Sequence, residues 1–162
     1  MITRYFKYII ISFLLVLIQS KIMRFFSLEG ITPDLLTIWI AYIAVQRGQM
    51  TGTLWGFALG MFYDLSVGSF IGLSALTKTI AGFTAGYFYD EQRTSMTLGS
   101  YRFLIVVLLV SFIHNALYFI IYTRGSETGF LSAIFEVGLA TTCYTTIISL
   151  LPVFFFARKI VK

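Results

Sequence analysis

Six apolar stretches follow one another along the chain, with only short polar breaks between them. They cover residues 5–26, 33–47, 51–67, 70–89, 102–123 and 130–157. A helix of roughly 17 to 25 apolar residues crosses the ~30 Å hydrocarbon layer of a bilayer, and inside that layer a helix satisfies its own backbone polar groups. The pattern therefore predicts an all-α integral membrane protein, with a single transmembrane domain over residues 1–162. Residues 46–49 are the only polar break between the second and third stretches, so five spans are the alternative to six.

The basic residues predict how the chain is oriented. Apolar residues make up 58% of the chain and charged residues only 12%, which fits a protein surrounded by lipid. With six spans, one side of the membrane receives Arg4, Lys7, Arg47, Arg93, Arg102, Arg158, Lys159 and Lys162, and the other receives Lys21, Arg24 and Arg124. Cytoplasmic loops retain Lys and Arg, so both termini are expected in the cytoplasm. The basic residues on the cytoplasmic side then face anionic lipid head groups. This explains the net charge of +5, and no nucleic-acid partner is expected.

The residue types that carry most enzyme chemistry are scarce. Cys143 is the single cysteine and His114 the single histidine, so the chain cannot form an internal disulfide or a thiolate metal site. The sequence contains no glycine-rich phosphate loop, no Ser/His/Asp pattern and no paired carboxylates. The connections between spans are also too short for a soluble catalytic domain. We therefore expect no catalytic residue, no metal ion, no cofactor and no enzyme activity.

Small residues recur at every fourth position of two neighbouring segments. The motif GFALGMFYD at 56–64 returns almost unchanged as GFTAGYFYD at 82–90. Glycine lets two helix backbones approach closely in lipid, although in a water-exposed helix it costs about 1 kcal/mol relative to alanine. The spacing predicts a groove, which serves either packing inside the chain's own bundle or a partner protein's helix. Its residues are Gly52, Gly56, Gly60, Gly82 and Gly86.

Three aspartates and one proline mark where the predicted helices end or bend. Asp34 and Asp64 fall at the outer ends of their helices, whereas Asp90 falls at the cytoplasmic side. The loop after Asp64 is short and contains no basic residue, so a functional contact at this outer helix end is one interpretation and a solvated end the other. Asp90 precedes a polar run, which favours a solvated end. Pro152 removes a backbone hydrogen bond inside the last span and predicts a bend near Ile148.

Ionisable residues inside spans are energetically costly and point to a role. Lys78, His114 and Glu136 are predicted at a common depth of about 9 to 13 Å below the outer surface, from the 1.5 Å rise per residue of a helix. A Lys78–Glu136 ion pair, with His114 and Asn115 completing its hydrogen bonds, is the simplest interpretation. An outward-opening pocket for a small molecule or lipid head group is the alternative, and snorkelling of the charges or misplaced spans is a third.

Residues 33 to 90 contain a recognisable order of motifs. TPDLL opens the second span, QRGQMTG forms the inner loop, GFALGMFYDLSVGS forms the third span and its end, and GLSAL begins the fourth. This order resembles the rod shape-determining protein family MreD of bacteria. The first, fifth and sixth spans resemble that family in hydropathy and number.

The resemblance implies a function and partners. Members of this family are non-enzymatic inner-membrane components of the cell-elongation machinery, and their fold is similar to the substrate-binding subunits of energy-coupling-factor vitamin transporters. They bind the single-span protein MreC, which links them to MreB, RodA and a penicillin-binding transpeptidase and so to lateral peptidoglycan synthesis. A substrate-binding subunit of a vitamin or lipid transporter is the alternative function. Those transporter subunits dock through a small-xxx-small signature on the first helix, which YFKYIIISFLLVLIQS lacks, so the scaffold is favoured.

Overall fold

The computed structural model describes residues 2–23, 25, 27, 31–68, 70–123 and 133–160, and for 2–5, 133, 134 and 156–160 it describes the backbone only. The first half contains α1 (Ile2–Leu17), the π-helical turn η1 (Ile18–Ile22), α2 (Leu35–Arg47), α3 (Gln49–Val67) and α4 (Leu73–Gly86). The second half contains α5 (Thr94–Leu98), α6 (Tyr101–Tyr122), the π-helical turn η2 (Ala133–Gly138), α8 (Leu139–Ile148) and α9 (Leu150–Ile160).

The predicted all-α class is confirmed. Each of the six predicted segments is helical in its described part, with ends that differ by a few residues from the prediction. The short helix α5, between the fourth and fifth segments, was not predicted. Within the described residues, Tyr101–Tyr122 and Phe135–Phe155 are long and apolar enough to cross a membrane. The count of six spans stays a prediction.

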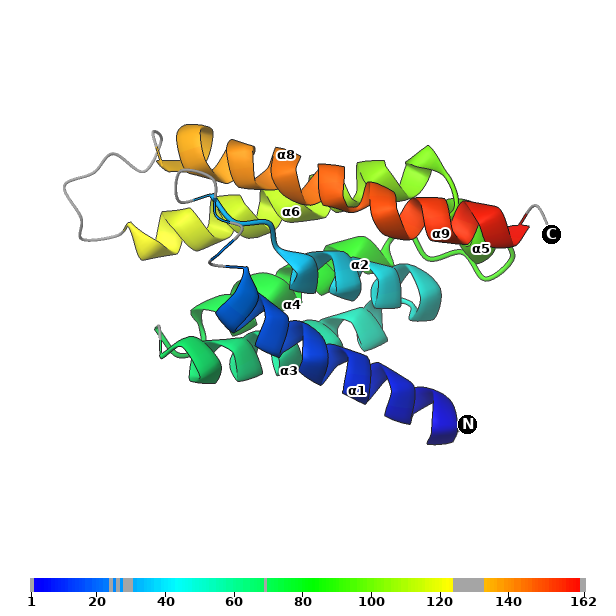
Figure 1. Ribbon diagram of the computed structural model, residues 1–162, viewed down its shortest axis with the longest axis horizontal. Helices are drawn as coiled ribbons and strands as arrows, with labels where there is room; N and C mark the ends of the chain where they lie inside the picture. Colours follow the sequence, from blue (N-terminus) through cyan, green and yellow to red (C-terminus); the bar gives the residue numbers. More distant parts are fainter. Residues whose placement is uncertain are drawn as a thin grey trace.

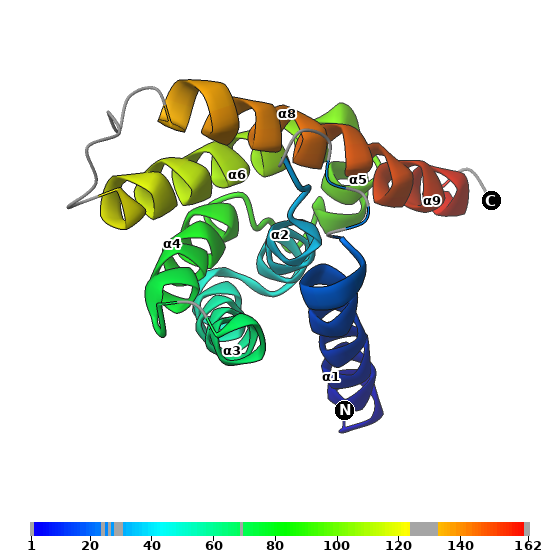
Figure 2. The same ribbon diagram turned by 60° about the vertical axis from the view of Figure 1, so that its left-hand side comes forward.

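Helix α2 lies in the middle of the molecule. Figures 1 and 2 place α3 and α4 on one side of it and α6 and α8 on another, with α1 beside it. Eight of its 13 residues are buried, as expected for a helix that is apolar around its whole circumference. Ile38, Ala41 and Ala44 pack into a core shared with α4 and α6. Leu36 and Ile40 pack into a second core shared with α1 and α3. Both hydrophobic cores therefore meet on α2.

Helix α1 begins and helix α9 ends at the same end of the bundle (Figure 1). An even number of spans requires this arrangement. Several residues used in the charge count, Arg24, Arg124 and Lys162, lie outside the described residues.

The last predicted span is interrupted where Pro152 predicted a bend. α8 ends at Ile148, and α9 begins at Leu150. Pro152 is thus the third residue of α9, in a first turn whose N–H groups have no partner inside the helix. The helix is therefore interrupted next to Ile148, where the bend was predicted, and the bend itself stays a prediction.

Candidate functional site

The polar site lies at the end of the bundle where α2 begins, which is the outer end in the predicted topology. Asp34 is the N-cap residue of this helix, and its Oδ1 accepts a hydrogen bond of 3.0 Å from the Thr37 N–H. Its Oδ2 accepts a second bond of 2.8 Å from the Thr37 hydroxyl. An N-cap carboxylate satisfies backbone donors that would otherwise have no partner in the first turn. Asp34 is therefore held in place by its own helix.

The same carboxylate forms a buried ion pair across the bundle. Lys78 of α4 donates from Nζ to Asp34 Oδ2, and the Lys78 residue is only 2% exposed. His114 of α6 places Nε2 at 3.2 Å from the same Oδ2, and Lys78 Nζ lies 3.3 Å from the Thr37 hydroxyl. The positive and negative charges thus compensate each other in a site with little access to water. We call Asp34, Thr37, Lys78 and His114 the aspartate cluster.

Further hydrogen bonds connect the start of α2 to the remaining helices. The Asp34 N–H donates to the Thr145 hydroxyl of α8 at 3.0 Å. Gln19 of η1 donates from Nε2 to the Pro33 carbonyl at 2.9 Å and accepts from the Leu35 N–H at 3.0 Å. The aspartate cluster and its neighbours therefore join elements from both halves of the chain.

The predicted Lys78–Glu136 ion pair is wrong. Glu136 lies on η2 with an exposed side chain, and the carboxylate that meets Lys78 belongs to Asp34. A common depth fixes how far residues lie along the membrane normal, but it does not fix which way each side chain points around its helix. Depth alone therefore identified Lys78 and His114 and selected the wrong acid.

Asn115 belongs to a neighbouring contact between helices. Its Nδ2 donates to the Thr142 hydroxyl at 3.0 Å and to the Gly138 carbonyl at 3.4 Å. These bonds attach α6 to η2 and α8. A cavity of about 190 Å³ lies between this contact and the aspartate cluster, and its lining includes Lys78, His114, Asn115 and Tyr118.

The glycines of the predicted groove, which we call the glycine stripe, lie between α3 and α4. They are Gly52, Gly56, Gly60, Gly82 and Gly86. A Cβ added at Gly60 would lie 2.5 Å from the Cα of Ala75, and one added at Gly82 would lie 2.6 Å from the carbonyl carbon of Gly52. Added Cβ atoms at Gly56 and Gly86 would likewise meet the backbone of the facing helix. Of the two interpretations of the stripe, the structure adopts packing inside the chain's own bundle. The repeated motif lets two consecutive helices approach backbone to backbone.

The two aspartates that close the repeated motif have different surroundings. Asp64 is fully buried and accepts hydrogen bonds from the N–H groups of Gly72 at 2.9 Å, Ser74 at 3.1 Å and Ala75 at 3.2 Å. The end of α3 thus caps the start of α4. Asp90 is exposed and accepts one bond of 3.0 Å from the Gln92 N–H, as the prediction of a solvated end requires.

Several hydrogen-bonding residues of this site were not predicted. Thr37, Thr142, Thr145 and Gln19 are all buried, and each lies inside an apolar stretch. Thr37 stands three residues after Asp34, the spacing at which an N-cap side chain meets a backbone N–H. This spacing was the signal that could have identified Thr37, whereas Gln19, Thr142 and Thr145 each have a polar neighbour in the sequence and carry no comparable signal.

The comparison with protein families decides what kind of protein this is. The family model described as rod shape-determining protein MreD matches residues 1–160. The chain belongs to the MreD family. The match extends well beyond the motifs at 33–90 and covers both the aspartate cluster and the glycine stripe. No curated protein and no solved structure matches the chain.

Membership in the MreD family implies a role in rod shape determination. MreD proteins are shape-determining structural proteins and not a known enzyme family. The family and the apolar helices together indicate a membrane protein. In the described part of the chain, no group of three or more His, Cys, Asp or Glu side chains is arranged to hold a metal ion.

Proposed function

We propose that this MreD-family protein is a non-enzymatic scaffold in the bacterial inner membrane that binds the transmembrane helix of MreC. Through MreC it connects to MreB, RodA and a penicillin-binding transpeptidase, and it supports lateral peptidoglycan synthesis. Six spans, cytoplasmic termini and a fold like the vitamin-transporter subunits belong to the same proposal. The observation that carries it is the family match over residues 1–160.

The chemistry of the polar site favours a structural role. Asp34 and Lys78 pair with each other. Asp34 also contacts His114, and Lys78 also contacts Thr37. A buried charge pair that joins two helices favours one arrangement of those helices, because separating the pair would leave each charge uncompensated. A scaffold needs such a fixed arrangement, because it acts by presenting a surface of constant shape to its partner and not by catalysing a reaction.

The glycine stripe is not the surface we propose for MreC, because α4 already covers it. The face of α3 that points away from the bundle is the better candidate. It presents Leu54, Phe57 and Leu65 at 64%, 52% and 61% exposure, with the small residue Ala58 exposed among them. Close contact at small residues drives helix association in lipid. Its rigid attachment to α4 makes α3 a firm platform for a partner helix.

A transporter subunit is the second candidate, and one observation favours it. The cavity of about 190 Å³ lined by Lys78, His114, Asn115 and Tyr118 lies where an outward-opening substrate pocket was predicted. It is small compared with typical ligand pockets of roughly 300 to 1,000 Å³. The scaffold is therefore preferred.

Cell shape separates the two functions. Deleting the gene from a rod-shaped host should give round cells, and the wild-type protein should restore rods. The double variant Leu54→Ala with Phe57→Ala should fail to restore them at normal protein levels. The matched variant Leu76→Ala with Phe83→Ala, on exposed positions of α4, should succeed. Rod-shaped deletion cells, together with a vitamin retained by the purified protein, would favour the transporter.

A further inference from the structure

A groove separates α1 from the end of α8 and the start of α9, with α2 as its floor. Its volume is about 1080 Å³, above the usual range of roughly 300 to 1,000 Å³ for pockets that enclose small ligands. The wall on α1 includes Ile11 and Leu15, and the opposite wall includes Ile148 and Leu151. Helix α1 meets α2 and α3 and leaves this side of α2 open.

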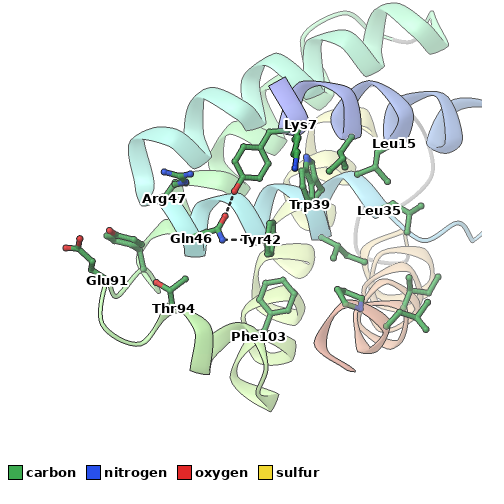
Figure 3. A pocket seen from close by; sticks show the side chains of 17 residues that line it. Lys7, Leu15, Leu35, Trp39, Tyr42, Gln46, Arg47, Glu91, Thr94 and Phe103 are labelled. Atoms are coloured by element: carbon green, nitrogen blue, oxygen red, sulfur yellow. Dashed lines mark hydrogen bonds between the residues drawn. The ribbon is translucent and has the colours of Figure 1, made fainter. Parts of the chain in front are cut away.

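The groove changes from polar to apolar along its length. In Figure 3, Arg47, Glu91 and Thr94 lie at one end and Leu15 and Leu35 at the other, with Lys7 and Trp39 between them. The polar end is where α1 begins and α2 ends, which is the cytoplasmic side in the predicted topology. The polar end of the groove thus lies at the level of the inner-leaflet head groups, and its apolar end lies at the level of the acyl chains.

Aromatic contacts hold the polar end in a defined shape. The Tyr8 hydroxyl donates to Gln46 Oε1, a bond drawn in Figure 3, and Gln46 Nε2 donates to the Tyr42 hydroxyl at 3.3 Å. The Arg47 guanidinium lies 5.9 Å from the centre of the Tyr8 ring. The Trp39 ring stacks on Tyr42 with 5.2 Å between centroids. Tyrosine and tryptophan favour the boundary between lipid tails and head groups.

We propose that this groove binds an anionic phospholipid of the inner leaflet. Lys7 and Arg47 would hold the phosphate, and an acyl chain would lie along Trp39 and Leu35 towards Leu151. Charge complementarity supports this occupant, because the groove lining carries two cations, Lys7 and Arg47, and one carboxylate, Glu91. Basic pockets between transmembrane helices on the cytoplasmic side are suited to anionic lipid head groups.

Tryptophan fluorescence tests the proposal on the full chain. The protein has two tryptophans, and Trp39 lines the groove whereas Trp55 does not. In a Trp55→Phe variant the fluorescence reports on Trp39 alone. This variant is placed in phosphatidylcholine vesicles, and the vesicle lipid is replaced stepwise by brominated phosphatidylglycerol or by brominated phosphatidylcholine. We expect brominated phosphatidylglycerol to quench Trp39 at a much lower mole fraction. A Trp39→Phe variant, which reports on Trp55, should not distinguish the two lipids.

Charge variants identify the head-group site. Lys7→Gln with Arg47→Gln should reduce the preference for phosphatidylglycerol by about thirtyfold, the value expected for two cationic contacts near a membrane surface. Lys7→Gln alone changes an exposed side chain and should reduce it about fivefold, which keeps the test valid if the double variant misfolds. Arg93→Gln with Arg102→Gln removes the same charge from exposed residues outside the groove and should leave the preference unchanged.

Three results would overturn the proposal. The first is equal quenching of Trp39 by the two brominated lipids. The second is a phosphatidylglycerol preference that survives in both the Lys7 variant and the double variant. The third is a disulfide from Ile11→Cys, in a Cys143→Ser background, to a single cysteine in the MreC span. That adduct would assign the groove to a protein helix.

Discussion

At the scale of single residues, Asp34 combines two roles that are usually separate. It caps the first turn of α2 through Thr37 and neutralises Lys78 from α4. Removing one member of a buried ion pair leaves the other charge without compensation, which costs about 3 to 5 kcal/mol. Such a residue makes the fold depend on contacts between distant parts of the chain.

The first prediction is that Asp34 and Lys78 are energetically coupled. Asp34→Asn keeps a good N-cap side chain and removes only the charge, so it and Lys78→Met should each lower the free energy of unfolding by about 3 to 5 kcal/mol. The double variant should lose clearly less than the sum. The measurement is a double-mutant cycle on unfolding in detergent. Glu136→Gln, at an exposed residue, should stay within about 0.5 kcal/mol of wild type. Strict additivity would contradict the pair.

The second prediction compares Asp64 with Asp90. Asp64→Ala should lower the free energy of unfolding by about 1 to 3 kcal/mol, because it leaves buried N–H groups of α4 without an acceptor. Asp90→Ala, at an exposed position, should change it by less than about 0.5 kcal/mol. Chemical unfolding of the two variants side by side provides the measurement. Equal effects would show that Asp64 does not cap α4.

At the scale of secondary-structure elements, the repeated glycine motif makes α3 and α4 a single unit. Gly60 faces Ala75 and Gly52 faces Gly82 at backbone distance, and Asp64 closes the connection by capping α4. The left-handed conformation of Gly68, with φ of 70°, ends α3, a position that favours glycine. The sequence repeat therefore encodes a helical hairpin whose two backbones approach directly at the glycine positions.

The third prediction concerns this hairpin. Gly60→Leu should separate α3 from α4 and lower the thermal midpoint in detergent, since a Cβ alone would lie 2.5 Å from the Ala75 backbone. The cost should be about 1 to 3 kcal/mol or more, the range for overpacking. Ala58→Leu, on the exposed face of the same helix, is the matched control and should be nearly neutral. Membrane insertion should be normal for both. A Gly60→Leu protein as stable as the control would contradict the packing.

The sequence predicts elements better than it predicts their contacts. Apolar length located the helices, and glycine spacing identified a close helix contact. The helix break next to Ile148 lies where Pro152 predicted a bend. The partner of Lys78 was missed, because residue spacing gives depth along a span but not the relative rotation of spans far apart in the chain. Helix α5 was missed because its five residues carry no apolar periodicity that separates them from a loop.

At the scale of the whole molecule, α2 lies in the middle of the bundle, and both hydrophobic cores meet on it. One side of α2 faces the open groove. The aspartate cluster fixes the end at which α2 begins, and the proposed lipid groove runs along one side of α2 from Leu35 to Arg47. The other helices present large apolar side chains outward, as a protein embedded in lipid requires. This arrangement leaves an outer helix face available to a partner.

The fourth prediction is the topology. Both termini should lie in the cytoplasm, because the basic residues then divide eight to three in favour of that side. A phosphatase reporter that is active only outside the cytoplasm should be inactive when fused after Lys162. The same reporter inserted after Gly125, in the loop between the fifth and sixth predicted spans, should be active. The reverse pattern would contradict the orientation.

The central claim is that the protein works by binding the transmembrane helix of MreC, and site-specific crosslinking in living cells tests it most directly. Single cysteines at Leu54, Phe57 or Leu65, in a Cys143→Ser background that still restores rods, are combined with a single cysteine in the MreC span. A disulfide needs Cβ atoms about 4 Å apart. The account predicts adducts from this face of α3 and none from Ala44→Cys or Ala81→Cys, which are fully buried. The claim would be contradicted if the cells stay rod-shaped and no adduct forms. This result must hold for cysteines scanned along the whole MreC span and over all exposed faces of this protein.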